Sequence, residues 1–284
     1  CLILVGLFFA RPLYRMNLLT IGDYYRNRYN RPVEVVTSIC IALSYLGWVA
    51  AQVTALGLVF NTISQGEISN TSGMIIGAAV VLVYTLFGGM WSVAFTTFIQ
   101  MIIIVLGLIY IAWLVSGMAG GFSTVVTHAA AAGKFEFLPR MELRDVIAFI
   151  AAWVTMGLGS IPQQDVFQRV NASRNESTAA WGSMLGGAAY FLFAFVPLFL
   201  AYSATLIDPK MVSGLIGGDS QLILPTLILN HLPLHAQIIF FGALLSVIMS
   251  TASGTLLAPS VTISENVLRG LFKDKNVIKI DVLD

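Results

Sequence analysis

A group of hydroxyl side chains interrupts the last apolar segment of the chain. Serine and threonine occur at five positions between Leu244 and Thr255: Ser246, Ser250, Thr251, Ser253 and Thr255. Ser246, Ser250 and Ser253 share one helix face because they lie three and four residues apart. Sodium, like other hard cations, prefers oxygen ligands, so hydroxyls beside backbone carbonyls favour a cation site. The alternative is structural, because hydroxyls in membrane helices also bond to their own backbone and permit close packing.

A second unusual segment covers residues 156–165, inside the apolar stretch 145–168. It contains two glycines and Pro162, followed by three polar residues. Each glycine costs a helix about 1 kcal/mol relative to alanine, and proline removes a backbone hydrogen bond. The pattern favours a helix broken at membrane depth, with its freed backbone groups facing protein or a water-filled cavity. A proline kink with polar residues near the membrane interface is the alternative.

Composition places both segments in a membrane protein. Apolar residues make up 57% of the chain and charged residues only 10%, whereas soluble domains carry about 25% charged residues. No charged residue occurs in 177–207 or in 220–264, stretches longer than the ~20 residues that cross a bilayer. The net charge of +1 gives no basic footprint for nucleic acid. We therefore expect an all-α polytopic protein whose partner is the lipid bilayer, and no pattern of catalytic residues indicates an enzyme.

The apolar pattern predicts six complete spans after an opening stub at residues 1–10. The spans are 32–63, 74–87, 91–115, 145–168, 179–204 and 236–263. Gly88-Gly89 predicts a tight turn between the second and third spans. Residues 221–232 are apolar but short and contain Pro225, so we expect a helix in a surface loop.

Positive charge is concentrated at one end of the predicted bundle. Eleven basic residues fall in three connecting segments: Arg11, Arg15, Arg26, Arg28, Arg31, Arg169, Arg174, Arg269, Lys273, Lys275 and Lys279. The opposite end has four: Lys134, Arg140, Arg144 and Lys210. The positive-inside rule places the first set in the cytoplasm. The sequence thus predicts an integral, multi-pass protein of the plasma (inner) membrane.

Four local patterns together resemble the sodium:solute symporter family. They are Thr20-Ile-Gly-Asp-Tyr-Tyr25, Gly88-Gly-Met-Trp-Ser-Val-Ala-Phe-Thr-Thr-Phe-Ile-Gln100, Gln164-Asp-Val-Phe-Gln-Arg169, and Met249-Ser-Thr-Ala-Ser253 with Ser264-Glu-Asn266. They occur in the family's order across nearly the whole chain. The resemblance implies a partial inverted-repeat fold of five plus five helices, with 145–168 as the broken helix that opens the second repeat. It also implies that residues 1–284 are the central part of a single transporter domain, truncated at both ends.

The resemblance further implies sodium-coupled symport of a small organic solute by alternating access. The family's sodium ligands match the hydroxyls of Ser250 and Thr251 and the backbone carbonyl of Val247. Its other ligands belong to a broken helix that would precede Cys1. The family usually has Thr-Asp where this chain has Thr96-Thr97, which favours one sodium ion per cycle or an altered coupling.

Solute contacts in the family match Trp48, Met156 and Ser160, and Gln163 stands where the choline-transporting branch tends to have tryptophan. Residues 159–162 and 167–169 look closest to that branch. Trp48 could supply one wall of an aromatic cage for a quaternary ammonium group. Met156 and Ser160 depart from the aromatic residues that relatives often have, which leaves the solute open. Asp165 lies four residues before Arg169, so we expect a helical ion pair.

Other classes of function stay open at this point. One is a transporter-like sensor module of a signalling protein, since some relatives fuse such a module to a kinase. A membrane-embedded enzyme or a purely structural bundle would leave the hydroxyls near Ser250 without a function.

Overall fold

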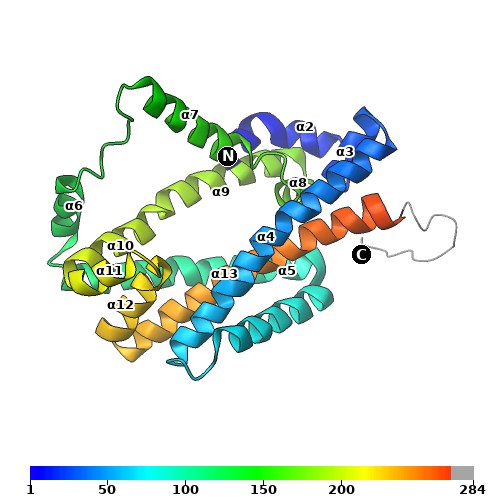
Figure 1. Ribbon diagram of the computed structural model, residues 1–284. Helices are drawn as coiled ribbons and strands as arrows, with labels where there is room; N and C mark the ends of the chain where they lie inside the picture. The colour runs from blue at the N-terminus through cyan, green and yellow to red at the C-terminus, as the bar shows by residue number, and fades with distance from the viewer. Residues whose placement is uncertain (270–284) are drawn as a thin grey trace. The chain divides into compact units, whose positions relative to one another are not determined.

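The computed structural model describes residues 1–269, apart from the side chains of residues 88–92 and of Met156. Within this part the chain is helical and contains no strand, which confirms the all-α prediction. Its first half comprises α1 (Leu2–Leu4), the π-helix η1 (Val5–Phe9), α2 (Ala10–Arg15), α3 (Ile21–Arg28), α4 (Arg31–Ile63), α5 (Asn70–Met118) and α6 (Phe122–Ala131). Its second half comprises α7 (Leu143–Leu158), α8 (Gln164–Asn171), α9 (Glu176–Phe193), α10 (Phe195–Ile207), α11 (Pro209–Leu215), η2 (Ser220–Leu222), α12 (Ile223–His231), α13 (Leu234–Thr262) and the π-helix η3 (Ile263–Leu268). Figure 1 labels most of these helices along the chain.

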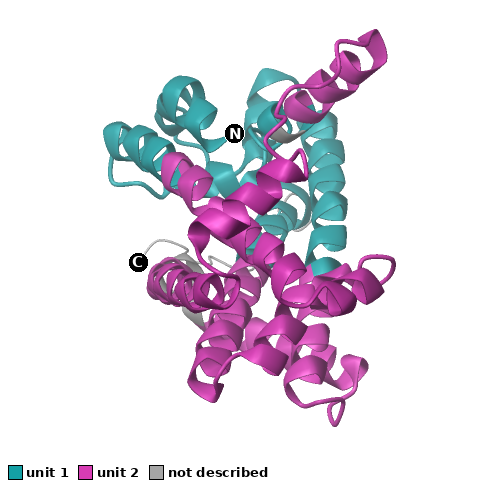
Figure 2. Ribbon diagram, turned by 90° about the vertical axis from the view of Figure 1, so that its left-hand side faces the viewer, with its two compact units in different colours: residues 1–51, 155–186, 254–284 teal, residues 52–154, 187–253 magenta. Residues whose placement is uncertain are grey.

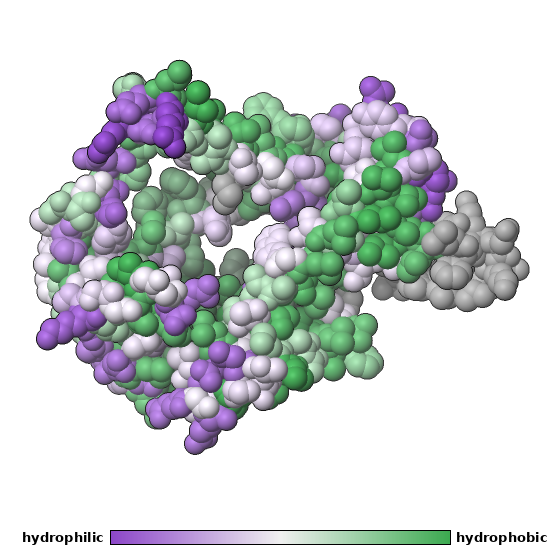
Figure 3. Space-filling model, in the orientation of Figure 1, coloured by the Kyte–Doolittle hydropathy of each residue, from purple (hydrophilic) through white to green (hydrophobic). Residues whose placement is uncertain are grey.

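Five helical segments are long and apolar enough to cross a membrane: Arg31–Ile63, Asn70–Phe87, Val93–Met118, Glu176–Ile207 and Leu234–Leu268. They confirm five of the six predicted spans. Their large apolar side chains point outward, as for Leu43 and Leu46 on α4, which are 60% and 63% exposed. Apolar surface is correspondingly broad in Figure 3, while hydrophilic residues gather at the connection between α6 and α7. Such a surface is stable in lipid and not in water.

The remaining predicted span, 145–168, is interrupted, as its glycines and proline predict. α7 ends at Leu158, and α8 begins at Gln164 after a non-helical connection. Another break was not predicted: the expected helix 179–204 is divided at Ala194 into α9 and α10. Pro197 explains it, because proline has no N–H to donate to the carbonyl of Phe193, one turn earlier.

The turn predicted at Gly88-Gly89 agrees in position with a change of direction in the chain (Figure 1), although the backbone is helical from Asn70 to Met118. Tyr84 and Thr97 would be about 20 Å apart along a straight helix, yet they hydrogen-bond to the adjacent residues Met249 and Ser250. Glycine pairs permit sharp bends within a helix, so α5 bends here without leaving helical geometry.

The chain divides into two compact units (Figure 2). Unit 1 combines Cys1–Ala51, Thr155–Gly186 and the segment from Gly254 onward. Unit 2 combines Gln52–Val154 and Gly187–Ser253. The divisions fall inside the long helices α4, α7, α9 and α13, so neither unit is a continuous piece of sequence.

In unit 1 the opening helices pack on α8 and α9. The buried cluster consists of Val5, Ala10, Val166, Val170, Ala179 and Ala180. Gly6 allows the closest approach, because a Cβ there would lie 2.7 Å from the carbonyl oxygen of Ala180. Arg15 pairs with Glu176 at 2.6 Å, and the Thr20 hydroxyl bonds to Asn266. These contacts bring the three arginine-bearing segments to the same end, as predicted, while Lys273, Lys275 and Lys279 lie outside the described residues.

In unit 2 the end of α4 packs against the start of α5, and the later part of α5 packs against α13. Both contacts depend on glycine: a Cβ at Gly77 would lie 2.8 Å from Leu56, and one at Gly107 would lie 3.0 Å from Ile239. A separate cluster joins α10, α11 and α12. α12 lies within residues 221–232, for which we predicted a short non-spanning helix, and that prediction is confirmed.

Candidate functional site

The predicted sodium-binding groups lie on one turn of α13 in unit 2. The Thr251 hydroxyl donates to the Val247 carbonyl oxygen at 2.9 Å, which brings two of the three predicted oxygens together. The third belongs to Ser250, whose hydroxyl lies 3.1 Å from that of Thr97 on α5. All three oxygens are neutral and belong to types that hard cations accept. The donor set therefore fits a monovalent cation such as sodium.

Further hydroxyls surround this turn. The Tyr84 hydroxyl donates to the Met249 carbonyl at 2.8 Å, and the buried Ser253 hydroxyl donates to the Ser250 carbonyl at 2.9 Å. Together with the side chains of Thr97, Ser250 and Thr251, they form what we name the hydroxyl cluster: Tyr84, Thr97, Ser250, Thr251 and Ser253. Thr251 and Ser253 make the backbone bonds of the structural alternative, so this geometry is compatible with both interpretations. The Val247 carbonyl accepts the Thr251 hydroxyl and, because it lies inside α13, also the backbone N–H four residues on, so a cation that binds there would displace the hydroxyl bond.

The structure places Thr97 beside a predicted sodium ligand. The sequence marks it as a departure from the family's aspartate, and its hydroxyl is in contact with a predicted sodium ligand, Ser250. Tyr84, by contrast, was not predicted. A tyrosine in an apolar helix gave no signal by itself, and only the bend of α5 brings it to α13.

The predicted solute-binding residues belong to unit 1. Ser160 and Gln163 lie in the connection between α7 and α8, and both are half-buried. Gln163 is the N-cap residue of α8, and its side chain makes no capping hydrogen bond. The side chain of Met156 lies outside the described part of the chain. The structure thus places Ser160 and Gln163 in the same break, where the Gln163 side chain does not cap α8.

Trp48 is connected to this break through Tyr45. Its ring is stacked on that of Tyr45, with centroids 5.9 Å apart, and the residue is 37% exposed. The Tyr45 hydroxyl donates to Asp165 Oδ1 at 2.8 Å and accepts from the Asp165 backbone N–H at 3.2 Å. Tyr45 was not predicted, and it ties the helix that carries Trp48 to the first turn of α8.

The predicted ion pair between Asp165 and Arg169 is confirmed, with Nη1 of the arginine 2.8 Å from the carboxylate. The Asp165 side chain is only 14% exposed, so the pair and the bond from Tyr45 satisfy a carboxylate that is largely removed from solvent. Gly254 leaves room for the arginine, since a Cβ there would lie 3.2 Å from its guanidinium.

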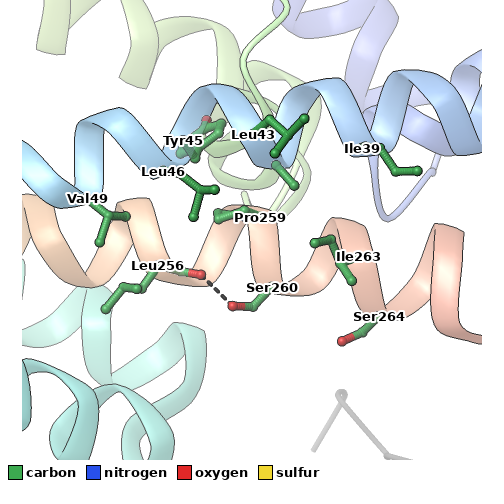
Figure 4. A pocket seen from close by; sticks show the side chains of 11 residues that line it. Ile39, Leu43, Tyr45, Leu46, Val49, Leu256, Pro259, Ser260, Ile263 and Ser264 are labelled. Atoms are coloured by element: carbon green, nitrogen blue, oxygen red, sulfur yellow. Dashed lines mark hydrogen bonds between the residues drawn. The ribbon is translucent and has the colours of Figure 1, made fainter.

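An apolar groove of about 470 Å³ runs between α4 and the end of α13 in unit 1 (Figure 4). Aliphatic side chains such as Leu46 and Leu256 line it, together with two serines, Ser260 and Ser264. The Ser260 hydroxyl already donates to the Leu256 carbonyl. A solute site needs polar groups that fix orientation, so this groove fits lipid or a neighbouring helix better than a polar solute.

The chain is similar to known transport proteins. The high-affinity choline transporter 1 of Homo sapiens is 28% identical over 98% of this chain and 49% of its own length. The high-affinity proline transporter PutP of Bacillus subtilis is 25% identical over 90% of this chain and 54% of its own length. The chain therefore spans about half the length of the curated relatives that it matches.

The fold is also that of a solved transporter. The substrate-bound outward-open state of a Na+-coupled sialic acid symporter matches 98% of this chain and 59% of its own, with a TM-score of 0.81 at 19% identity. The fold prediction is thereby confirmed, and the spanning helices make this an integral, multi-pass membrane protein. The model of the sodium:solute symporter family matches residues 1–279, so the chain belongs to the sodium:solute symporter family.

Proposed function

We propose that this chain is the central part of a single transporter domain that couples sodium entry to uptake of a small organic solute. The observation that carries the proposal is the turn of α13 that bears the Val247 carbonyl, bonded to the Thr251 hydroxyl, and the Ser250 hydroxyl, bonded to that of Thr97. Family membership supports the same function. The protein would act in the plasma membrane, where a potential of ~100 mV is worth roughly 2.3 kcal/mol per sodium ion. That energy corresponds to about 50-fold accumulation at ~1.36 kcal/mol per decade.

The proposed mechanism is alternating access. Sodium binds at the Val247 carbonyl with Ser250 and Thr251, and the binding energy favours the outward-open state, in which the solute meets Trp48, Ser160 and Gln163. Met156 belongs to the same proposed solute site. Because Thr97 brings a hydroxyl where the family usually has a carboxylate, the cluster carries no negative charge of its own. One sodium ion per cycle is therefore the proposed stoichiometry.

For the solute, we propose a quaternary ammonium compound of the choline class, with proline as the second candidate. The choline transporters and the proline transporter among the relatives support these two choices. The exposed ring of Trp48 favours the first, because an indole face attracts a cation within about 6 Å. Competition between choline and proline for sodium-dependent uptake distinguishes them.

Sodium-dependent thermal stabilisation of the purified full-length protein tests the ion site. A ligand that binds only the folded state stabilises it by RT ln(1 + [L]/Kd), or ~2.7 kcal/mol at about a hundredfold excess. We expect sodium, and not potassium, to raise the melting temperature of the wild type. The double substitution Ser250→Ala/Thr251→Ala should abolish this rise.

Ser203→Ala is a matched control, because its hydroxyl also bonds to its own helix, at the Phe199 carbonyl of α10. It should keep the full response to sodium. A wild type that responds equally to both ions would overturn sodium coupling and favour the sensor interpretation.

A further inference from the structure

Asn266 lies at the centre of a buried polar network that neither candidate site uses. Its side-chain N–H groups donate to Asp23 Oδ1 at 2.8 Å and to Glu34 Oε1 at 2.9 Å. Its carbonyl oxygen accepts from the Thr20 hydroxyl at 2.7 Å. Both amide protons and the amide oxygen are therefore satisfied. We name these four residues, Thr20, Asp23, Glu34 and Asn266, the Asn266 clasp.

The clasp holds charge in a buried position. Glu34 is completely buried, and its second oxygen lies 2.7 Å from the guanidinium of Arg31 and 3.8 Å from that of Arg26. Thr20 and Asp23 also form the capping box that begins α3. A polar network of this kind is stable when every member has a partner, and losing one member leaves the others unsatisfied. Loss of one member of the clasp should therefore weaken the bonds of the others.

The same short segment is also held by the broken helix. Gln164, the first residue of α8, is fully buried, and its side-chain oxygen accepts from the Ile21 backbone N–H at 2.8 Å. Thr20, the preceding residue, is bonded to Asn266 on η3, which directly follows α13. The N-cap residue and the first residue of α3 thus fasten η3, which continues the helix of the proposed sodium site, and α8, which follows the proposed solute site.

We propose that the Asn266 clasp and the neighbouring bond between Ile21 and Gln164 together form a latch at the cytoplasmic end, which keeps α8 and η3 fastened to the start of α3 until the solute path opens on that side. The proposal rests on the proposed transport function. Alternating access needs an element with two discrete arrangements that sodium can bias. We assign this role to the clasp because its members share their hydrogen bonds on Asn266, and because the arginines of the adjacent loop place it at the end assigned to the cytoplasm.

Thr20→Val tests the latch, because it removes one hydroxyl at nearly constant volume. If the latch favours the state that binds external sodium, breaking it lowers the population of that state. The apparent affinity then falls by the same fraction. We expect the sodium concentration for half-maximal thermal stabilisation of the full-length protein to rise about tenfold. Deuterium exchange should also rise in α3 and in α8 together.

Two variants serve as controls. Thr20→Ser keeps the hydroxyl and should restore wild-type behaviour in both measurements. Ser264→Ala alters an exposed hydroxyl on η3, the π-helical segment that carries Asn266, and should change neither. If the Asn266→Ala variant folds, it should raise the half-stabilising sodium concentration and the deuterium exchange more than Thr20→Val does.

A purely structural clasp gives a different pattern. Thr20→Val would then lower the melting temperature and leave both the half-stabilising sodium concentration and the exchange in α8 at wild-type values, which overturns the latch. If the wild type itself did not respond to sodium, the proposed function would fail separately. The exchange data would then decide alone: joint opening of α3 and α8 in Thr20→Val supports the latch, and unchanged α8 overturns it.

Discussion

The hydroxyl cluster in unit 2 and the Asn266 clasp in unit 1 are both polar groups inside an apolar protein, but they are built from different interactions. Most bonds of the hydroxyl cluster join a neutral hydroxyl to a nearby carbonyl, as between Thr251 and Val247. The clasp joins residues more than two hundred positions apart and includes the buried carboxylate of Glu34. The bonds of the hydroxyl cluster are all between neutral groups, whereas the clasp also holds a buried carboxylate.

This difference follows from the energetics of burial. A neutral hydrogen bond contributes about 0.5–1.5 kcal/mol net, because the separated groups can bond elsewhere. A buried charge that loses its partner costs about 3–5 kcal/mol. We therefore expect substitutions in the clasp to change folding stability and substitutions in the hydroxyl cluster to change sodium binding. The following predictions test that division.

The largest effect is expected from Glu34→Ala. It leaves an Asn266 amide proton and the nearby Arg31 guanidinium without their acceptor. We expect the free energy of unfolding to fall by about 3 kcal/mol, the lower end for a broken buried pair. Chemical denaturation in detergent micelles measures it.

Glu67→Ala is the matched control, since Glu67 is the other charged residue between Pro32 and Lys134 and is exposed in the structure. Its substitution should change stability by less than about 0.5 kcal/mol. Equal losses for the two variants would mean that the buried contacts of Glu34 do not contribute to the free energy of unfolding.

Gly22→Ala should give the next largest loss. A Cβ at this position would lie 2.6 Å from the Asn266 side chain and 2.7 Å from the Ser38 hydroxyl. Overpacking of this kind typically costs about 1–3 kcal/mol. The same denaturation experiment measures it. Gly47→Ala provides the contrast, because nothing lies within 4 Å of its added Cβ, and alanine should stabilise the helix there. A tolerated Gly22→Ala would show that the clasp can relax around a methyl group.

The two regions also differ in how far the sequence predicts them. Sequence periodicity and the glycine–proline pattern predict the spans and the break near Pro162, because those features depend on local propensity. The hydroxyls near Ser250 are visible as a composition anomaly along one helix. The clasp is not, since it depends on the meeting of two short motifs, around Thr20 and Asn266, that are far apart in the chain. Each motif resembles one of the sodium:solute symporter family, and neither indicates by itself which residue it contacts.

Sequence reasoning is less complete where a helix changes direction. Gly88-Gly89 indicates where the chain turns, but it does not indicate which residues on either side of the turn are brought to α13. The contact of Thr97 with Ser250 depends on that change of direction. Pro197 was likewise visible in the sequence, and its effect on the Phe193 carbonyl is a local rule that the prediction of one continuous helix overlooked.

Thr97 offers a smaller but sharper test of the hydroxyl cluster. Thr97→Val removes its bond to Ser250 and should cost about 1 kcal/mol of stability without sodium. Thr97→Asp should instead add a negative charge beside the proposed ion site and lower the half-stabilising sodium concentration about tenfold, or ~1.4 kcal/mol. Thr96→Asp is the control, because the Thr96 hydroxyl bonds to the Val93 carbonyl of its own helix. If both aspartates raise sodium affinity equally, Thr97 has no special relation to the ion.

The smallest expected effect concerns Asp208 in unit 2, the N-cap residue of α11. The Met211 backbone N–H bonds to its carboxylate at 3.0 Å, and His231 lies 3.2 Å away, so together they hold the pKa of Asp208 below its ordinary value. A lowered pKa in the folded state means that the charged form stabilises the fold above the unfolded-state value of about 3.9. This contribution is lost as the pH falls through the lower folded-state pKa. Melting temperatures of the wild type and Asp208→Asn should therefore differ slightly at pH 7 and converge as the pH falls below the folded-state pKa of Asp208, because asparagine keeps the capping oxygen and loses only the charge. The exposed Asp219 makes no capping bond, so Asp219→Asn should show no such convergence. A difference at Asp208 that persists at low pH would mean that the shape of the side chain, and not its charge, supports the start of α11.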